Sequence, residues 1–531
     1  MRAERLFRAL GMVEPSLVEE ALAVRQRPWR RWAAMAACLA LVMGLAFGWR
    51  SAGGFQGFAG GTSSGGDSGS SGGSSSGCLT GEPPADGGEG MENGTAFLSY
   101  AGPVFPLSTA EDSAGLTAER TVTWDFAPGT NHYGETRQWG AAVTDAYILG
   151  NPTDSGVTVT ALYPFAGTFD SLAEMRPQVT VDGQAVEAAL YAGAYSGGFQ
   201  STFGADDPDT MNLDTIDSWE EYRALLEDGT YLEQALAEYP SLDIPAAVYE
   251  FSDFEAPLEE YRAATQAVSF DISPEKTAVF TYGFNGMEQD GTFRRYSYFV
   301  PDGMRNEPDL KMLVVLGEDI GTYTLQGYED GGCDRGEEIG GVSCTVTRSE
   351  TTLDAVLDRL CEYYRERYAQ GRAADQADAF DTVPFALYRG AVAELLSQYG
   401  VLSGAPMDRY GDGRLDDILA ETLSHDRVLY LAFPVTVSAG GSAEVECRLW
   451  KEPSFDYACS GSENEGLQGY DLVTRLGSGL VFTRQSAVLV NAENVEITGQ
   501  DFGFDPENGV SAVELDLERE RYGLEIRPRE K

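Results

Sequence analysis

The chain has 531 residues, of which 37 are Lys or Arg and 84 are Asp or Glu, so its formal net charge at pH 7 is −47. A surface of this sign repels nucleic acid, which argues against a nucleic-acid partner. The length predicts two to four domains. With only two histidines in the chain, His132 and His425, a histidine-based catalytic triad and a two-histidine zinc site are not expected.

Residues 1–31 are predicted to be a cytoplasmic amphipathic segment, in which residues 1–26 form two short helices. Ser16 and Glu19 fit a capping box at the start of the second helix. A bare cytoplasmic tail does not need an apolar stripe, so we expect this segment to bind a cytosolic protein; a passive tail that folds against the bilayer is the alternative. The apolar residues at helical spacing are Leu6, Phe7, Leu10, Leu17, Val18, Ala21 and Leu22.

Residues 32–49 contain no charged side chain and are predicted to form a transmembrane helix. As a helix they reach roughly 27 Å, close to the thickness of a bilayer core. Four arginines precede the stretch within seven residues and Arg50 alone follows it, which places 1–31 in the cytoplasm and 50–531 outside the cell. The predicted localisation is therefore the cell membrane, with a single span. A cleaved signal peptide is the alternative.

Residues 50–95 are rich in Gly and Ser and are predicted to be a linker. Residues 96–205 then alternate as strands do, for example at 121–126 and 157–163, with turns at Asn151-Pro152 and Asp182-Gly183. Several short strands at this spacing predict a β-sandwich-like domain.

The rest of the chain continues the β pattern with helices inserted. Residues 206–350 are predicted to hold a helical hairpin at 217–238 and a second β domain, 351–426 a helical subdomain, and 427–531 a C-terminal β domain. The predicted fold class is α+β and mainly β: one transmembrane helix, then tandem β-sandwich-like modules with inserted helices.

Two pairs of cysteines flank Gly-rich or polar turns between strand-like runs. Cys333 and Cys344 form the first pair, and Cys447 and Cys459 the second. Outside the cell each pair is predicted to close a hairpin loop as a disulfide. Cys361 lies on the apolar face of a predicted helix, as a buried thiol does, and no Cys-x-x-Cys motif points to redox catalysis.

Residues 408–416 form the most specific local motif. Asp408, Asp412 and Asp416 occupy positions 1, 5 and 9 of a calcium loop, while Tyr410 and Leu419 break positions 3 and 12. Calcium is therefore one reading, and an ordinary turn before a helix is the other. No other cofactor is expected.

Two stretches of sequence resemble known bacterial segments. The sequence LFRALGMVEPSLVEEAL at 6–22 resembles a cytoplasmic segment of Gram-positive membrane proteins regarded as anti-sigma-like. Residues 145–169, 176–183 and 469–489 are similar to a family of uncharacterised membrane-anchored proteins of the same bacteria. The resemblance implies a sigma factor as cytosolic partner, although residues 1–31 lack the His/Cys cluster of zinc-binding anti-sigma domains. It implies an architecture and no site.

These patterns favour a non-enzymatic protein. We expect an envelope sensor or regulator, anti-sigma-like, that signals through its N-terminal segment. Two alternatives remain open: a cell-surface binding or adhesion module with an inert anchor, and a glycan-active envelope enzyme, since glycoside hydrolysis needs only two carboxylates.

Overall fold

A computed structural model describes residues 99–111, 115–131, 134–137, 139–193, 218–257, 264–301, 309–371, 379–398, 402, 413–457 and 464–529. The predicted cytoplasmic segment 1–31, transmembrane helix 32–49 and linker 50–95 lie outside the described residues. Within the described residues, no helix is both long and apolar enough to cross a membrane. What is described is mainly β, with several sheets and inserted helices, and this confirms the predicted β-rich class.

The first sandwich has a seven-stranded sheet as one layer. Its strands follow the order β27–β25–β3–β6–β22–β8–β9 and are antiparallel except for the pair β25–β3. Side chains along β3 and β6 alternate between buried and less buried, as expected when one sheet face is covered. The strands are β3 (Thr117–Asp125), β6 (Ala141–Gly150), β8 (Gln178–Val181), β9 (Gln184–Ala185), β22 (Ser442–Lys451), β25 (Val481–Val490) and β27 (Ala512–Glu514).

The opposing layer consists of two sheets that meet at Val104, which bridges both Phe165 and Leu472. Their orders are β1–β23–β24–β28–β26 and β10–β21–β7–β2. Trp124 and Tyr470 fill the space between the layers at one end. The strands are β1 (Ser99–Tyr100), β2 (Ser108–Thr109), β7 (Val157–Gly167), β10 (Ala189–Ala192), β21 (Arg427–Val437), β23 (Phe455–Asp456), β24 (Gln468–Val473), β26 (Val495–Gln500) and β28 (Arg521–Pro528). Smaller elements are β4 (Gly129–Thr130), β5 (Thr136–Arg137), α4 (Leu172–Met175), η4 (Ala492–Asn494) and η5 (Pro506–Asn508).

Strands from the two predicted modules 96–205 and 427–531 together form this one sandwich. β21 pairs with β7, β22 with β6, and β25 with β3. The sequence pattern sets which face of a strand is buried but not which strand lies beside it, so the modules looked separate. Everything between β10 and β21 is an insertion whose ends meet, because Ala192 lies opposite Leu429.

Helices α5 (Trp219–Leu226) and α6 (Thr230–Leu236) confirm the predicted helical hairpin. The Ser218 hydroxyl accepts a hydrogen bond from the Glu221 amide and so caps α5. Tyr222 and Tyr231 pack with Phe105 in the cluster that covers the outer face of the second layer. The hairpin thereby protects a sheet face that would otherwise meet water.

The second sandwich is built from residues 245–352, with the short strand β20 (Gly413–Arg414) added parallel to β13. One sheet has the order β19–β11–β16–β13–β20, and the facing sheet has the order β14–β15–β12–β17–β18. Phe251, Phe284 and Tyr298 make edge-to-face ring contacts in the core between them. The strands are β11 (Pro245–Glu255), β12 (Thr265–Asp271), β13 (Thr277–Tyr282), β14 (Gly286–Asp290), β15 (Phe293–Phe299), β16 (Lys311–Gly317), β17 (Tyr323–Tyr328), β18 (Glu338–Ile339), β19 (Ser343–Thr352) and β20 (Gly413–Arg414).

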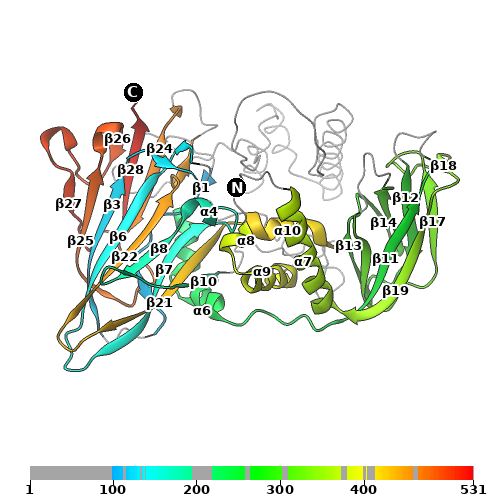
Figure 1. Cartoon of the computed structure of the whole chain (residues 1–531), viewed down its shortest axis with the longest axis horizontal. Coiled ribbons are helices and arrows are strands. Elements are labelled where there is room, and N and C mark those ends of the chain that lie inside the picture. Colours follow the sequence, from blue (N-terminus) through cyan, green and yellow to red (C-terminus); the bar gives the residue numbers. More distant parts are fainter. Residues whose placement is uncertain are drawn as a thin grey trace, which may run out of the picture.

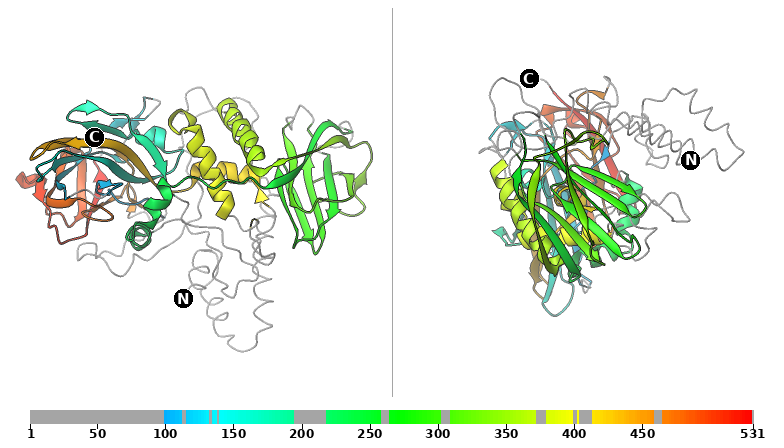
Figure 2. Two further views of the ribbon diagram at one scale, coloured as in Figure 1. Left: turned by 90° about the horizontal axis from the view of Figure 1, so that it is seen from below. Right: turned by 90° about the vertical axis from the view of Figure 1, so that its right-hand side faces the viewer.

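A helical layer lies between the two sandwiches (Figure 1; Figure 2, left). It contains α7 (Leu353–Gly371), α8 (Ala379–Thr382), α9 (Phe385–Gln398) and α10 (Leu415–Ser424), in the predicted helical region. Leu357 and Leu396 belong to the same apolar cluster as Phe280 of the second sandwich and Tyr163 of the first. One continuous core therefore runs through all three parts.

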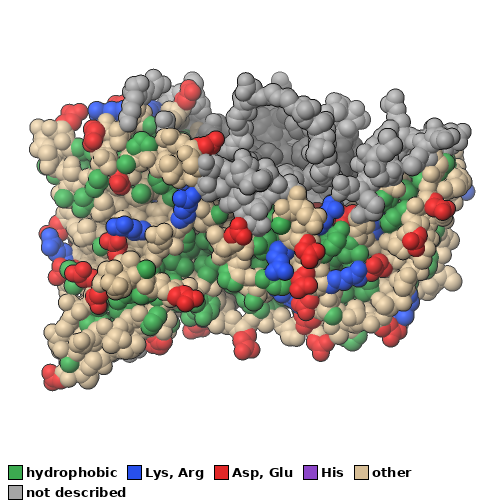
Figure 3. Space-filling model, viewed as in Figure 1, with side chains coloured by type: hydrophobic (Ala, Val, Ile, Leu, Met, Phe, Trp, Pro, Cys, Tyr) green, Lys and Arg blue, Asp and Glu red, His purple; other side chains and the backbone are tan. Residues whose placement is uncertain are grey.

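Acidic side chains do not gather into one patch on the face drawn in Figure 3. Asp and Glu are spread over it, with Lys and Arg interleaved among them. Ion pairs such as Lys276–Glu318, at 2.8 Å, join neighbouring strands at the surface. The negative charge of the chain is thus distributed and does not mark a single binding region on this face.

A fully buried ion pair lies inside the first sandwich. The Arg120 guanidinium donates to both carboxylate oxygens of Asp145, at 2.9 and 2.7 Å. The same guanidinium donates to the main-chain oxygens of Phe105 and Val473 in the opposite layer, and the Tyr147 hydroxyl donates to Asp145 at 2.7 Å. Burial raises the pKa of Asp145, and the arginine beside it opposes that rise. Both side chains are fully buried, so the hydrogen bonds of Arg120 to Phe105 and Val473 connect the two layers without access of water.

We expect Asp145→Ala to destabilise the protein by about 3–5 kcal/mol, because it leaves a buried guanidinium without its counter-charge. The double variant Arg120→Met/Asp145→Leu is expected to recover most of that loss, since no buried charge remains. Glu318→Ala, which removes an exposed pair, serves as the control and is expected to stay within about 0.5 kcal/mol. Thermal melting of the purified full-length variants measures the difference. Equal melting temperatures for Asp145→Ala and Glu318→Ala would contradict a structural role for the buried pair.

Candidate functional site

Of the three predicted calcium ligands, only Asp416 is among the described residues. Asp416 lies in the first turn of α10, 3.4 Å from the Arg414 guanidinium, and burial raises its pKa. Asp408 and Asp412 lie outside the described residues. Among the residues that the structure places, no group of three or more His, Cys, Asp or Glu side chains is arranged to hold a metal ion. Calcium binding at this loop stays a prediction.

The predicted Cys333–Cys344 disulfide is not formed, because the two thiols lie on opposite faces of one sheet. Cys333 packs with Ala267 and contacts Ser297, whereas Cys344 contacts Tyr298. Ser297 and Tyr298 are consecutive residues of β15, so their side chains point to opposite faces. Burial raises the pKa of both thiols. Sequence spacing alone could not show this difference in direction.

Of the remaining predicted site residues, only Cys447 is among the described residues. Cys447 is a free thiol on β22, buried opposite Asp145, and burial raises its pKa. Cys459 lies outside the described residues. So do the predicted partner-binding residues Leu6, Phe7, Leu10, Leu17, Val18, Ala21 and Leu22. No predicted site is therefore assembled among the residues that the structure describes.

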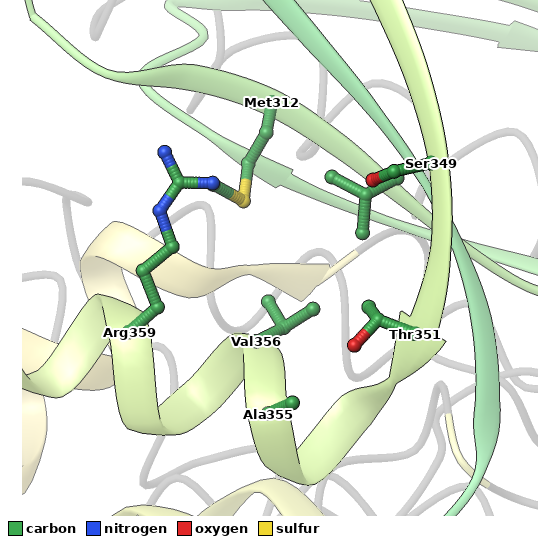
Figure 4. A pocket seen from close by; sticks show the side chains of 7 residues that line it. Met312, Ser349, Thr351, Ala355, Val356 and Arg359 are labelled. Carbon is green, nitrogen blue, oxygen red and sulfur yellow. The ribbon is translucent and has the colours of Figure 1, made fainter.

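The structure instead shows a small pocket where β19 turns into α7 (Figure 4). Its volume is about 150 Å³, and we call it the corner pocket. The buried side chains of Val248, Met312 and Val356 contribute its apolar lining. The remaining lining residues are Ser349 and Thr351 of β19, together with Ala355 and Arg359 of α7.

Among the described residues that line the corner pocket, the one charged side chain, Arg359, is already neutralised. The Arg359 guanidinium donates to both oxygens of Glu250, at 2.6 and 3.0 Å. The hydrogen bonds from Arg359 lower the pKa of Glu250, so the pair stays ionised at neutral pH. In Figure 4 the Arg359 side chain extends from α7 toward Met312. An anionic ligand would therefore gain little binding energy from Arg359. The pocket is better suited to a small apolar group bordered by hydroxyls.

Sequence reasoning missed the corner pocket. Val248, Met312 and Val356 follow the periodicity of ordinary core residues. One signal was present: alternate residues at 345, 347, 349 and 351 all carry hydroxyls, so one face of β19 has no apolar residue there. Such a face is typical of a strand that other elements leave uncovered.

A second cluster of ionisable groups is buried beneath α5. The Tyr100 hydroxyl donates to Asp471 at 2.7 Å, and Arg521 lies 3.5 Å from the same carboxylate oxygen. Burial raises the pKa of Asp471 to about 6 and lowers the pKa of Lys451 to about 8. Trp219 of α5 lies over the Arg521 guanidinium at 5.8 Å. These contacts join Tyr100 of β1, Asp471 of β24 and Arg521 of β28.

No family model matches the chain, and no curated protein matches it closely. The resemblance of residues 145–169, 176–183 and 469–489 to a membrane-anchored family therefore stays a prediction.

Acidification from pH 7 to pH 5 is expected to stabilise the wild type relative to Asp471→Asn by about 1 kcal/mol. The folded-state pKa of Asp471 is about 6, above the unfolded value near 3.9. Between these values the folded protein binds more protons, so stability rises as the pH falls. Melting temperatures of both full-length proteins at pH 5, 6 and 7 test this; the range ends above the isoelectric point of about 4.2. Parallel curves for the two proteins would contradict the raised pKa.

Proposed function

We propose that the protein is a single-pass membrane protein whose acidic folded part stands outside the cell and acts as an envelope sensor or regulator. In this proposal residues 1–31 hold a cytosolic partner such as a sigma factor, and the folded part responds to a ligand or to the state of the envelope. The protein carries out no reaction of its own.

The order of segments along the chain carries this proposal. An uncharged stretch at 32–49 follows a cluster of arginines, and a Gly/Ser-rich stretch separates it from the first described strand, β1. A helix of this length and flanking charge favours an N-terminus in the cytoplasm. The apolar stripe in 1–31 then stands on the side of the membrane where a regulatory protein would meet it.

The corner pocket supports a binding role for the folded part. It offers an apolar lining and hydroxyl groups, and its guanidinium is satisfied by Glu250. The lining residues named for it include no histidine, acid or cysteine that would activate the Ser349 hydroxyl. A small apolar ligand group fits this chemistry better than a reacting one.

The same pocket also favours a second candidate, a cell-surface binding module in which residues 1–31 are inert. The two candidates differ in one respect that is easily measured. The regulator needs the N-terminal stripe, whereas the binding module works without it.

Deletion of residues 2–24 is expected to abolish co-purification of one cytosolic protein with the tagged full-length chain, solubilised from its own membrane. Leu17→Asp is expected to reduce the recovery of that protein at least tenfold, because it places a charge in the apolar stripe. Glu20→Gln, next to the stripe, is the matched control and is expected to retain the partner. Identical profiles for the wild type and the deletion, measured by mass spectrometry, would reject the regulator and leave the binding module.

A further inference from the structure

One strand at the edge of a described sheet is unlike all the others. The edge strands β1, β2, β9, β10, β14, β18, β20, β26 and β27 are between 2 and 6 residues long, and β26 is interrupted by a bulge. β19 has 10 residues, and its pairing with β11 is regular from Thr345 to Thr352. It contains no proline and no lysine. Proteins usually shorten or interrupt exposed edges because a long, regular edge pairs with another strand.

The outer side of β19 presents a regular row of main-chain donors and acceptors. The Leu353 amide donates to the Ile244 oxygen at 2.8 Å, in register with the β19–β11 ladder. Because bonding alternates along an antiparallel pair, odd-numbered residues of β19 bond to β11 and even-numbered residues direct their N–H and C=O groups outward. The outward residues include Val346, Arg348 and Glu350. No described strand pairs with this side. Its main-chain N–H and C=O groups can therefore bond to another extended chain.

The charged side chains of β19 indicate which extended chain would pair with it and in which register. An added strand must place its own outward-bonding residue opposite each outward residue of β19. If a second copy of β19 pairs antiparallel about an axis at Ser349, Arg348 of each copy lies opposite Glu350 of the other. An axis at Arg348 or at Glu350 would place like charges opposite each other, and an axis at Thr347 would leave both charges without a direct partner. Opposite charges across a strand pair are favourable and like charges are not.

The side chains need little rearrangement to make this pairing. In the single chain the Arg348 guanidinium donates to Glu350 at 3.0 Å and to Asp319 at 2.8 Å. The Glu350 side chain is 78% exposed and can turn to the second copy while Asp319 stays in place. On the opposite face, Ser349 would meet Ser349 and Thr347 would meet Thr351, all of them small.

We propose that β19 is a homodimer interface in which two copies pair antiparallel about a two-fold axis at Ser349. The pairing joins the two β19–β20 sheets into one continuous sheet that crosses between the protomers. Such an interface is isologous, since each copy contributes the same surface. It also places the two corner pockets, which border Ser349 and Thr351, side by side across the axis.

Disulfide cross-linking of the full-length protein in its membrane tests the register directly. The main-chain groups of Ser349 bond to β11, so in the dimer the two Ser349 residues form a non-hydrogen-bonded pair. The Cα atoms of such a pair are about 4.5 Å apart. A disulfide can span this distance. We expect Ser349→Cys to give at least a fivefold larger dimer band than the wild type after mild oxidation. Thr347→Cys is the matched control: its two copies would stand about 13 Å apart, so we expect no gain. The double variant Thr347→Cys/Thr351→Cys is expected to cross-link again.

Charge exchange gives a second, independent test on the Ser349→Cys background. Arg348→Glu and Glu350→Arg are each expected to reduce the dimer band at least threefold, and their combination is expected to restore it. Melting temperatures of the same proteins show whether each variant is folded. Equal dimer bands for Ser349→Cys and Thr347→Cys would overturn the proposal, and so would a cross-link to a protein of another size. It is also overturned if the combined charge-exchange variant is folded but does not recover the dimer band.

Discussion

The buried pair of Arg120 and Asp145 fixes how the first sandwich closes. Two charges without water are tolerated only when each has a full set of partners, and here those partners come from both layers: β3 and β6 on one side, the main chain near Phe105 and Val473 on the other. Phe105 and Val473 are far apart in sequence, so the pair forms only when the early and late parts of the chain have met.

The insertion keeps its place through apolar contact. Its two ends meet at the β10–β21 pair, and a single apolar cluster extends from Tyr163 through α7 and α9 to Phe280. The helical layer therefore packs its apolar side chains against both sandwiches. The corner pocket lies where this layer meets an edge strand. Close packing is hardest to complete there, because among the described strands β19 has a neighbour on one side only.

Local pattern predicted the elements well and their neighbours poorly. The alternation at 121–126 and the helical spacing at 217–238 match β3, α5 and α6, because burial of one face leaves a period in the sequence. The joining of 96–205 with 427–531 left no such trace. Cys333 and Cys344 looked like a hairpin pair, although Cys333 lies between β17 and β18 and contacts Ser297, whereas Cys344 of β19 contacts Tyr298 on the opposite face of β15. The spacing of the two cysteines does not show this. The corner pocket was missed because Val248 and Met312 serve the core as well.

The nested order of the chain has a consequence for how the protein is made. β3 finds its parallel neighbour β25 about 365 positions later, so the first sandwich cannot close until nearly all of the described chain has been synthesised. Apart from β20, the strands of the second sandwich and α7 are contained within 245–371 and meet their neighbours much sooner. Because contacts close in sequence form faster than distant ones, the inserted unit matures first. The early strands must wait beside it, with their apolar faces uncovered, until the last third of the chain arrives.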